Sequence, residues 1–204
     1  MQPVEGETCG HQYCSWRTYT VDGGKLVPVS GSYAETKAML ISGLDLSSKT
    51  ILEIGCDAGQ LLQQIPNGYK SYTGIDVSDV KRLPVDSDSV KFIVGDAFGD
   101  EVELGKYDVV FALSLAHYLV PRLRDYLRLI DYPAKVKAFT MDGYFAALKR
   151  FVSIGGILVW DVIGYGDLPL DDMIAAAKRS FEMTDLHILR SNPDTFQAMI
   201  QVAR

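Results

Sequence analysis

The hydrophobic positions of the chain form short, nearly unbroken apolar runs separated by longer stretches with helical spacing. An apolar run without polar alternation is typical of a strand buried on both faces of a parallel sheet. Such strands are predicted at residues 50–54, 71–76, 89–94, 106–114 and 153–161. Helices are predicted at residues 32–44, from 60 to 65, 121–132, 136–151 and 171–181. This alternation indicates an α/β fold, a mostly parallel sheet with helices on both faces.

Two pairs of strands are separated by turn residues instead of by a helix. Near the start of the chain, residues 17–21 and 25–29 flank a Gly-Gly pair. Near the end, residues 187–190 and 195–202 flank a Ser-Asn-Pro-Asp sequence. Both turn sequences favour hairpins, so the last strand is expected to run antiparallel to its neighbours.

Composition and charge narrow the class of protein and its partners. The 204 residues are enough for one domain with its own core. A net charge of -6 argues against a phosphate-backbone partner, because such binding depends on Lys and Arg. Three cysteines, no secretory signal and no apolar run near the ~20 residues of a membrane span predict a soluble, cytoplasmic protein. We expect an N-terminal arm at 1–32 and a domain at 33–204, with an insertion at about 118–140.

Residues 51–59 join a predicted strand directly to a glycine turn and a helical stretch. Glycines at 55 and 59 let backbone N–H groups approach the polar tail of a ligand at a helix start. This arrangement predicts a nucleotide-cofactor loop, with a purely structural turn as the alternative. The spacing differs from the Gly-x-Gly-x-x-Gly fingerprint of dinucleotide-binding proteins.

The pattern Glu53-x-Gly55-x-Asp57-x-Gly59 resembles the first motif of the class I S-adenosylmethionine-dependent methyltransferases. Asp57 stands where the middle glycine of that motif usually is. A Gly-Gly turn at 155–156, which leads the chain into the fifth predicted strand within residues 153–161, extends the resemblance. The resemblance implies S-adenosylmethionine as the cofactor and a small molecule as the methyl acceptor. It also implies a Rossmann-like, seven-stranded, mostly parallel sheet with an antiparallel last strand.

The resemblance also implies cofactor contacts at the carboxyl ends of the strands. Asp76, seventeen positions beyond Gly59, is expected to accept hydrogen bonds from the ribose hydroxyls. Asp96 is expected to meet the adenine amino group. The alternatives are a turn aspartate at position 76, and a Gly-Asp turn with Phe98 in the core. The expected cofactor-binding set is Tyr33, Glu53, Gly55, Cys56, Asp57, Gly59, Asp76, Val77, Asp96, Ala97, Phe98, Leu113 and Ser114.

The resemblance further implies that the residues after the fourth predicted strand lie on the acceptor side of the site, with the insertion at about 118–140 as a cap over the substrate. His117 either takes a proton from the nucleophile during methyl transfer or packs near the cofactor. Tyr118, Arg122, Arg124 and Arg128 are expected to bind a carboxylate or phosphate of the substrate. A solvated helix face is the alternative for the arginines. The Asn/Asp-Pro-Pro-aromatic tetrad of enzymes that methylate amines on nucleic-acid bases is absent from this segment.

Cys9, His11 and Cys14 carry zinc-ligand chemistry but lack a fourth ligand nearby, so no metal is expected.

The expected activity is methyl transfer to an O, N or C nucleophile of a small, acidic molecule. Two other functions remain open. One is a catalytically silent binding partner with the same fold. The other is a NAD-dependent oxidoreductase, which would have tighter glycine spacing and a parallel sixth strand.

Overall fold

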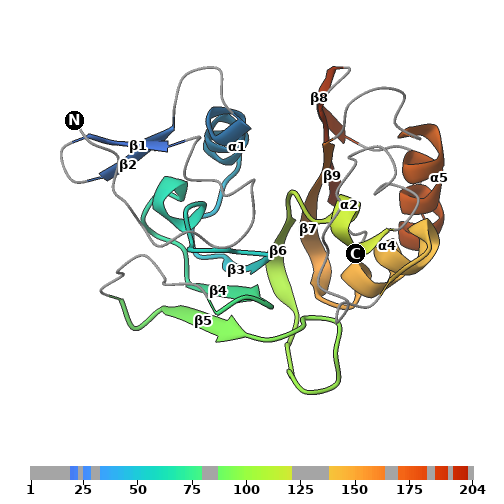
Figure 1. Ribbon diagram of the computed structural model, residues 1–204, viewed down its shortest axis with the longest axis horizontal. Helices are drawn as coiled ribbons and strands as arrows, with labels where there is room; N and C mark the ends of the chain where they lie inside the picture. The colour runs from blue at the N-terminus through green and yellow to red at the C-terminus, as the bar shows by residue number, and fades with distance from the viewer. Residues whose placement is uncertain are drawn as a thin grey trace.

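The computed structural model describes residues 19–22, 25–28, 33–79, 87–120, 138–163, 170–182, 187–192 and 195–201. The strands are β1 (Tyr19–Asp22), β2 (Lys25–Pro28), β3 (Thr50–Ile54), β4 (Ser71–Asp76), β5 (Val90–Val94), β6 (Tyr107–Ala112), β7 (Val152–Ile163), β8 (His187–Asn192) and β9 (Thr195–Gln201). The helices are α1 (Tyr33–Ser42), η2 (Leu62–Gln64), α2 (Ala116–Leu119), α4 (Met141–Lys149) and α5 (Leu170–Phe181). Figure 1 shows their arrangement.

One large sheet organises the fold, with the strand order β5-β4-β3-β6-β7-β9-β8. Neighbouring strands from β5 through β7 pair in parallel, and β9 pairs antiparallel with both β7 and β8. The α/β class, the parallel core of the sheet and the antiparallel last strand predicted from the sequence are confirmed. The chain leaves β3 toward β4 and later returns to the other side of β3 as β6. Ligands of open parallel sheets bind at such a reversal, outside the carboxyl ends of the strands.

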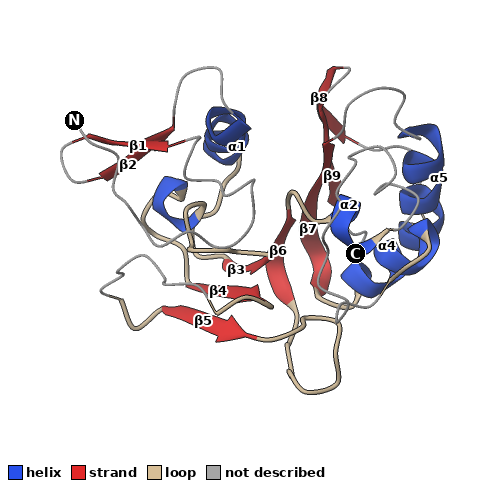
Figure 2. Ribbon diagram, in the orientation of Figure 1, coloured by secondary structure: helices blue, strands red, loops and turns tan. Residues whose placement is uncertain are grey.

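Both faces of the sheet are covered, because alternate strand residues point to opposite sides. Val110 and Ala112 belong to a core cluster with residues of α4 and α5, whereas Val109 and Phe111 belong to a cluster with residues of α1 and η2. Figure 2 shows α1 on one side of the sheet and α4 with α5 on the other. Helices therefore lie on both faces, as predicted.

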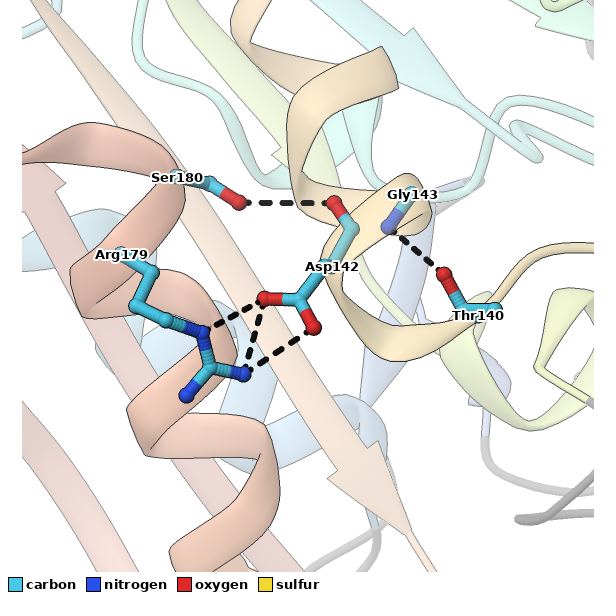
Figure 3. A network of polar contacts seen from close by, with 5 residues as sticks. All are labelled: Thr140, Asp142, Gly143, Arg179 and Ser180. Carbon is cyan, nitrogen blue, oxygen red and sulfur yellow. Dashed lines mark hydrogen bonds and ion pairs between the residues drawn. The ribbon is translucent and has the colours of Figure 1, made fainter.

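A polar network joins α4 to α5 (Figure 3). The Arg179 guanidinium donates to both carboxylate oxygens of Asp142, at 2.8 and 3.0 Å. Ser180 Oγ donates to the Asp142 carbonyl oxygen at 3.4 Å, and Thr140 Oγ1 caps α4 by accepting from Gly143 N–H at 3.1 Å. This cap explains why α4 begins at Met141, later than the predicted helix at 136–151.

Three other details differ from the sequence prediction. The expected helix after the glycine loop is only the 3-10 turn η2, because Pro66 restricts Ile65 to an extended conformation with φ -76° and ψ 125°. The glycines at 155 and 156 lie within β7, where Gly155 has φ +75°, and do not form a turn before the strand. The helix α2 was not predicted. The predicted helix at 121–132 lies outside the described residues.

Candidate functional site

The loop after β3 is held against the end of β4 by its own backbone. The N–H groups of Gly55 and Cys56 both donate to the Ile75 carbonyl oxygen, at 2.8 and 3.2 Å. Gly55, Asp57 and Gly59 adopt positive φ angles of 79°, 46° and 87°. Asp is among the few side-chain-bearing residues that visit this region readily. Asp57 therefore takes the left-handed conformation at the position where the resembled motif has glycine.

Phe92 of β5 is the reason that glycine is needed at two positions beside this loop. A Cβ atom built on Gly59 would lie 2.7 Å from the Phe92 ring. A Cβ on Gly74 of β4 would lie 2.8 Å from the same ring and 2.9 Å from Cys56 Sγ. Contacts below 3.0 Å require a neighbour to move. The loop, β4 and β5 are thus fitted together around one aromatic ring.

The Asp76 carboxylate joins the loop to the end of β4. Its Oδ2 accepts from Asp57 N–H at 3.0 Å, and its Oδ1 accepts from Ser78 N–H at 2.8 Å. The bond to Ser78 is the turn role considered from the sequence. Because each carboxylate oxygen can accept a second hydrogen bond, this role leaves capacity for a ligand. Asp76 is half-buried, so a ligand at the strand ends can reach it.

Two apolar side chains are exposed beside Asp76. Val77 is 45% exposed, and Val94, which pairs with Asp76 across β4 and β5, is 53% exposed. Asp96, two residues later, is half-buried and accepts from Phe98 N–H at 2.9 Å. Carboxylates next to uncovered apolar side chains suit a planar ring with amino and hydroxyl groups.

Ala97 and Phe98 turn away from this edge into the core. Phe98 is 4% exposed and packs against Phe139 and Phe151, with ring centroids 5.1 and 5.9 Å apart. Ala97 is 6% exposed in the same cluster. The core alternative therefore describes the Phe98 ring better than the expected adenine contact, because its faces are already covered. Asp96 is the accessible member of this group.

A lysine that the sequence analysis missed, Lys37 of α1, lies near the acidic residues Glu53 and Asp57. Glu53 is buried in β3 and accepts a hydrogen bond from the Tyr72 hydroxyl. Burial raises the pKa of the Glu53 carboxyl. Lys37 of α1 is half-buried; burial lowers the pKa of its ammonium, and the nearby charges of Glu53 and Asp57 oppose that shift. The position of Lys37 one helical turn after Tyr33 was the available signal.

Asp161 of β7 is a second residue that the sequence analysis missed, and it accepts a hydrogen bond from Ser114, in the residue pair that follows β6. Ser114 has φ +56°, and its N–H donates to Asp161 Oδ1 at 2.6 Å. Asp161 is fully buried. The next residue, Leu115, approaches the loop: a Cβ built on Gly55 would lie 3.3 Å from Leu115 Cδ1. Leu113, by contrast, is buried in the core cluster of the α1 face. The carboxyl end of β6 thus contacts the glycine loop.

Several expected site residues are only partly described. Tyr33 begins α1 and His117 lies in α2, but their side chains are outside the described part of the structure. Tyr118 of α2 is half-buried. The positions outside the described residues are Cys9, His11, Cys14, Arg122, Arg124 and Arg128.

Within the described residues, no group of three or more His, Cys, Asp or Glu side chains could hold a metal ion. No helix of the described part is long and apolar enough to cross a membrane.

The buried carboxyl of Asp161 predicts a pH-dependent stability. Burial raises its pKa to about 8, whereas an aspartate in an unfolded chain titrates near about 3.9. Below about pH 4 the carboxyl is protonated in both the folded and the unfolded chain. As the pH rises toward 8, only the unfolded chain releases the proton, so the folded state loses stability relative to it. We expect the free energy of unfolding to fall between pH 5 and 7.5, by up to about 1.4 kcal/mol per pH unit from this group. Urea denaturation across this range measures the slope.

The variant Asp161→Asn should flatten this slope, because an amide does not titrate. Asp108→Asn is the matched control. Backbone and side-chain hydrogen bonds from Thr50 lower the pKa of Asp108, so its contribution is lost only as the pH falls below about 4. An unchanged slope in Asp161→Asn would show that other groups, such as Glu53, cause the pH dependence.

Comparison with known proteins gives matches in structure but not in sequence. No protein-family model matches the chain, and no curated protein matches its sequence. The N-methyltransferase NodS from Bradyrhizobium japonicum WM9 matches with a TM-score of 0.56 and 14% identity, over 86% of this chain and 100% of NodS. A TehB-like SAM-dependent methyltransferase from Corynebacterium glutamicum matches with a TM-score of 0.52 and 14% identity, over 81% of this chain and 86% of that protein.

Human N-acetylserotonin methyltransferase, solved in complex with SAM, gives a third match. Its TM-score is 0.57 at 12% identity, and the match covers 83% of this chain but 52% of the human protein. At such low identity these matches concern the fold. The chain therefore has the fold of the class I S-adenosylmethionine-dependent methyltransferases.

Proposed function

We propose that this protein binds S-adenosylmethionine at the carboxyl ends of β3 to β6 and transfers its methyl group to an O, N or C atom of a small molecule. The observation that carries the proposal is the Asp76 carboxylate, which is bound to the Asp57 N–H of the glycine loop and still has acceptor capacity. A ribose beside that loop would find its hydrogen-bond acceptor there. The expected cytoplasmic location belongs to the same proposal and rests on the composition.

The residues present fit this cofactor along its length. Gly55 and Gly59 leave the loop backbone without side chains at its closest points, and Asp76 would hold the ribose hydroxyls. Val77 and Val94 offer uncovered apolar surface for adenine, with Asp96 for its amino group.

The amino-acid end of the cofactor is a zwitterion, and opposite charges are available for it. Glu53 and Asp57 are negative when ionised, and Lys37 is positive when protonated. An ammonium group suits the carboxylates and a carboxylate suits the lysine. Tyr33, one helical turn before Lys37, is the other α1 residue we propose to line this end.

When bound, the cofactor supplies an electrophilic methyl group on a sulfonium. The chain then has to orient the acceptor and exclude water. Ser114 and α2 lie at the end of β6, and His117 of α2 is the residue that we propose to accept a proton if the nucleophile must lose one. Tyr118 and the arginines of the insertion remain the proposed contacts for an acidic substrate.

Of the two alternative functions, the structure argues against the NAD-dependent oxidoreductase, whereas the catalytically silent partner has to be tested by experiment. A dinucleotide-dependent oxidoreductase was expected to add a parallel sixth strand, but the strand beside β7 is the antiparallel β9. The NAD reading is therefore disfavoured. A catalytically silent partner with the same fold is distinguished by measuring binding.

Isothermal titration of the protein with S-adenosylmethionine, S-adenosylhomocysteine and NAD tests the proposal. We expect dissociation constants in the micromolar range for the first two ligands and no heat from NAD. The glycine spacing and the antiparallel strand are the reasons for this preference. If none of the three ligands binds, the loop is structural and the silent-partner function replaces the proposal.

A further inference from the structure

Asp161 lies near the carboxyl end of β7, in a strand whose other central residues are apolar. Its neighbours Trp160 and Val162 belong to the core cluster that includes α4 and α5. Because strand residues alternate, Asp161 lies on the opposite face, the face of α1. Its Oδ1 accepts from Ser114 N–H, and its Oδ2 has no hydrogen-bond partner among the described residues.

A stabilising role alone explains this aspartate poorly. A buried carboxyl with one unpartnered oxygen costs free energy that an apolar side chain in the same strand would not cost. The same carboxyl makes one short bond to a backbone N–H forty-seven residues away. What Asp161 provides is therefore the fixed position of that N–H.

The backbone conformation of Ser114 requires stabilisation by its surroundings. A non-glycine residue with φ +56° is in a sparsely populated, unfavourable conformation, which persists only where the surroundings determine it. The bond from Ser114 N–H to Asp161 is one determinant. Without it, the turn can relax toward ordinary backbone conformations.

The turn at Ser114 touches both halves of the proposed site. The Leu115 side chain lies against Gly55 of the glycine loop. The Leu115 carbonyl oxygen accepts from the N–H groups of Tyr118 and Leu119, at 3.0 and 3.3 Å, so it begins α2. A change in the turn would move both the cofactor loop and the helix that carries His117.

We propose that Asp161 is a positioning residue: by holding Ser114 N–H, it sets the turn that aligns the glycine loop with α2. This inference rests on the proposed function, because the alignment matters for cofactor and acceptor. Asp161 itself is fully buried and acts through the turn, without touching either ligand.

The test compares Asp161→Leu, which removes the acceptor, with Asp161→Asn, which keeps a carbonyl oxygen at the same place. We expect Asp161→Leu to bind S-adenosylhomocysteine at least tenfold more weakly by calorimetry, and the Ser114 amide to exchange hydrogen faster. Asp161→Asn should bind within about threefold of the wild type. The matched control is Asp108→Leu, which removes an acceptor of Thr50 N–H at the opposite end of β6; it should lower the melting temperature without weakening binding.

A second variant tests the route through the turn. Glycine adopts positive φ without a steric cost, so Ser114→Gly should restore much of the affinity lost in Asp161→Leu. Should Asp161→Leu fail to fold, Asp161→Ala replaces it in the same comparisons. Wild-type affinity and Ser114 exchange in a folded Asp161→Leu or Asp161→Ala protein would overturn the inference. Absence of binding in the wild type would instead contradict the proposed function, and the Ser114 exchange rate would still report on the turn.

Discussion

Asp76→Ala is expected to weaken the binding of S-adenosylhomocysteine by about two orders of magnitude while the protein remains folded. The substitution removes charge-assisted hydrogen bonds to the ribose, each worth about 1.5–3 kcal/mol, and about 1.4 kcal/mol corresponds to tenfold in affinity. It also releases the Asp57 N–H, which Asp76 holds at 3.0 Å. Isothermal titration measures the affinity, and circular dichroism checks the fold.

Asp79→Ala is the matched control for this experiment. Asp79 lies in the turn that follows β4, is exposed, and carries the same charge. Its removal should change the affinity by no more than about twofold, because a solvent-exposed charge interacts only weakly with its neighbours. Near-wild-type binding by Asp76→Ala would remove Asp76 from the cofactor site and leave it the turn role that its bond to Ser78 already shows.

The strands were predictable because each is buried on both faces and therefore reads as an apolar run. Residues 50–54 and 71–76 match β3 and β4 at both ends. The final hairpin was predictable from the turn residues at 191–194, which favour a hairpin over a crossover helix. In each case the signal is local, so neighbouring residues alone decide the outcome.

The missed residues depend on partners far away in the sequence. Asp161 follows apolar residues of β7, and no neighbouring residue indicates that its carboxylate accepts a hydrogen bond from Ser114 N–H, forty-seven positions earlier. Nothing close to Lys37 in the sequence shows that it interacts with Glu53 of β3, sixteen positions later. The short η2 is a different case, because Pro66 stands in the sequence and shows where the helix has to end.

Gly59→Ala is expected to cost about 2–4 kcal/mol of stability and to impair cofactor binding. Part of the cost comes from φ +87°, which any residue with a Cβ adopts with difficulty. The other part comes from the Phe92 ring, 2.7 Å from the new methyl group. At about 2–4 °C per kcal/mol for a protein of this size, the melting temperature should fall by about 4–16 °C. Thermal unfolding followed by circular dichroism measures it.

Gly68→Ala separates these two contributions. Gly68 has φ +107°, but a Cβ there would meet nothing within 4 Å. Its substitution should cost only the conformational part, about 1–2 kcal/mol, and should leave cofactor affinity unchanged. Equal losses in Gly59→Ala and Gly68→Ala would show that the contact with Phe92 is unimportant.

Shortening Phe92 identifies the steric part directly. In a Phe92→Leu background the methyl group of Gly59→Ala has more room, so the second substitution should cost about 1–2 kcal/mol less than it does in the wild type. Phe92→Leu alone has its own cost, because the ring also packs against Gly74 and Tyr72. The interaction term of the double-mutant cycle removes that cost from the comparison. Additive losses would mean that the loop is set by its backbone alone; a favourable interaction term would mean that β5 shapes the cofactor loop through this ring.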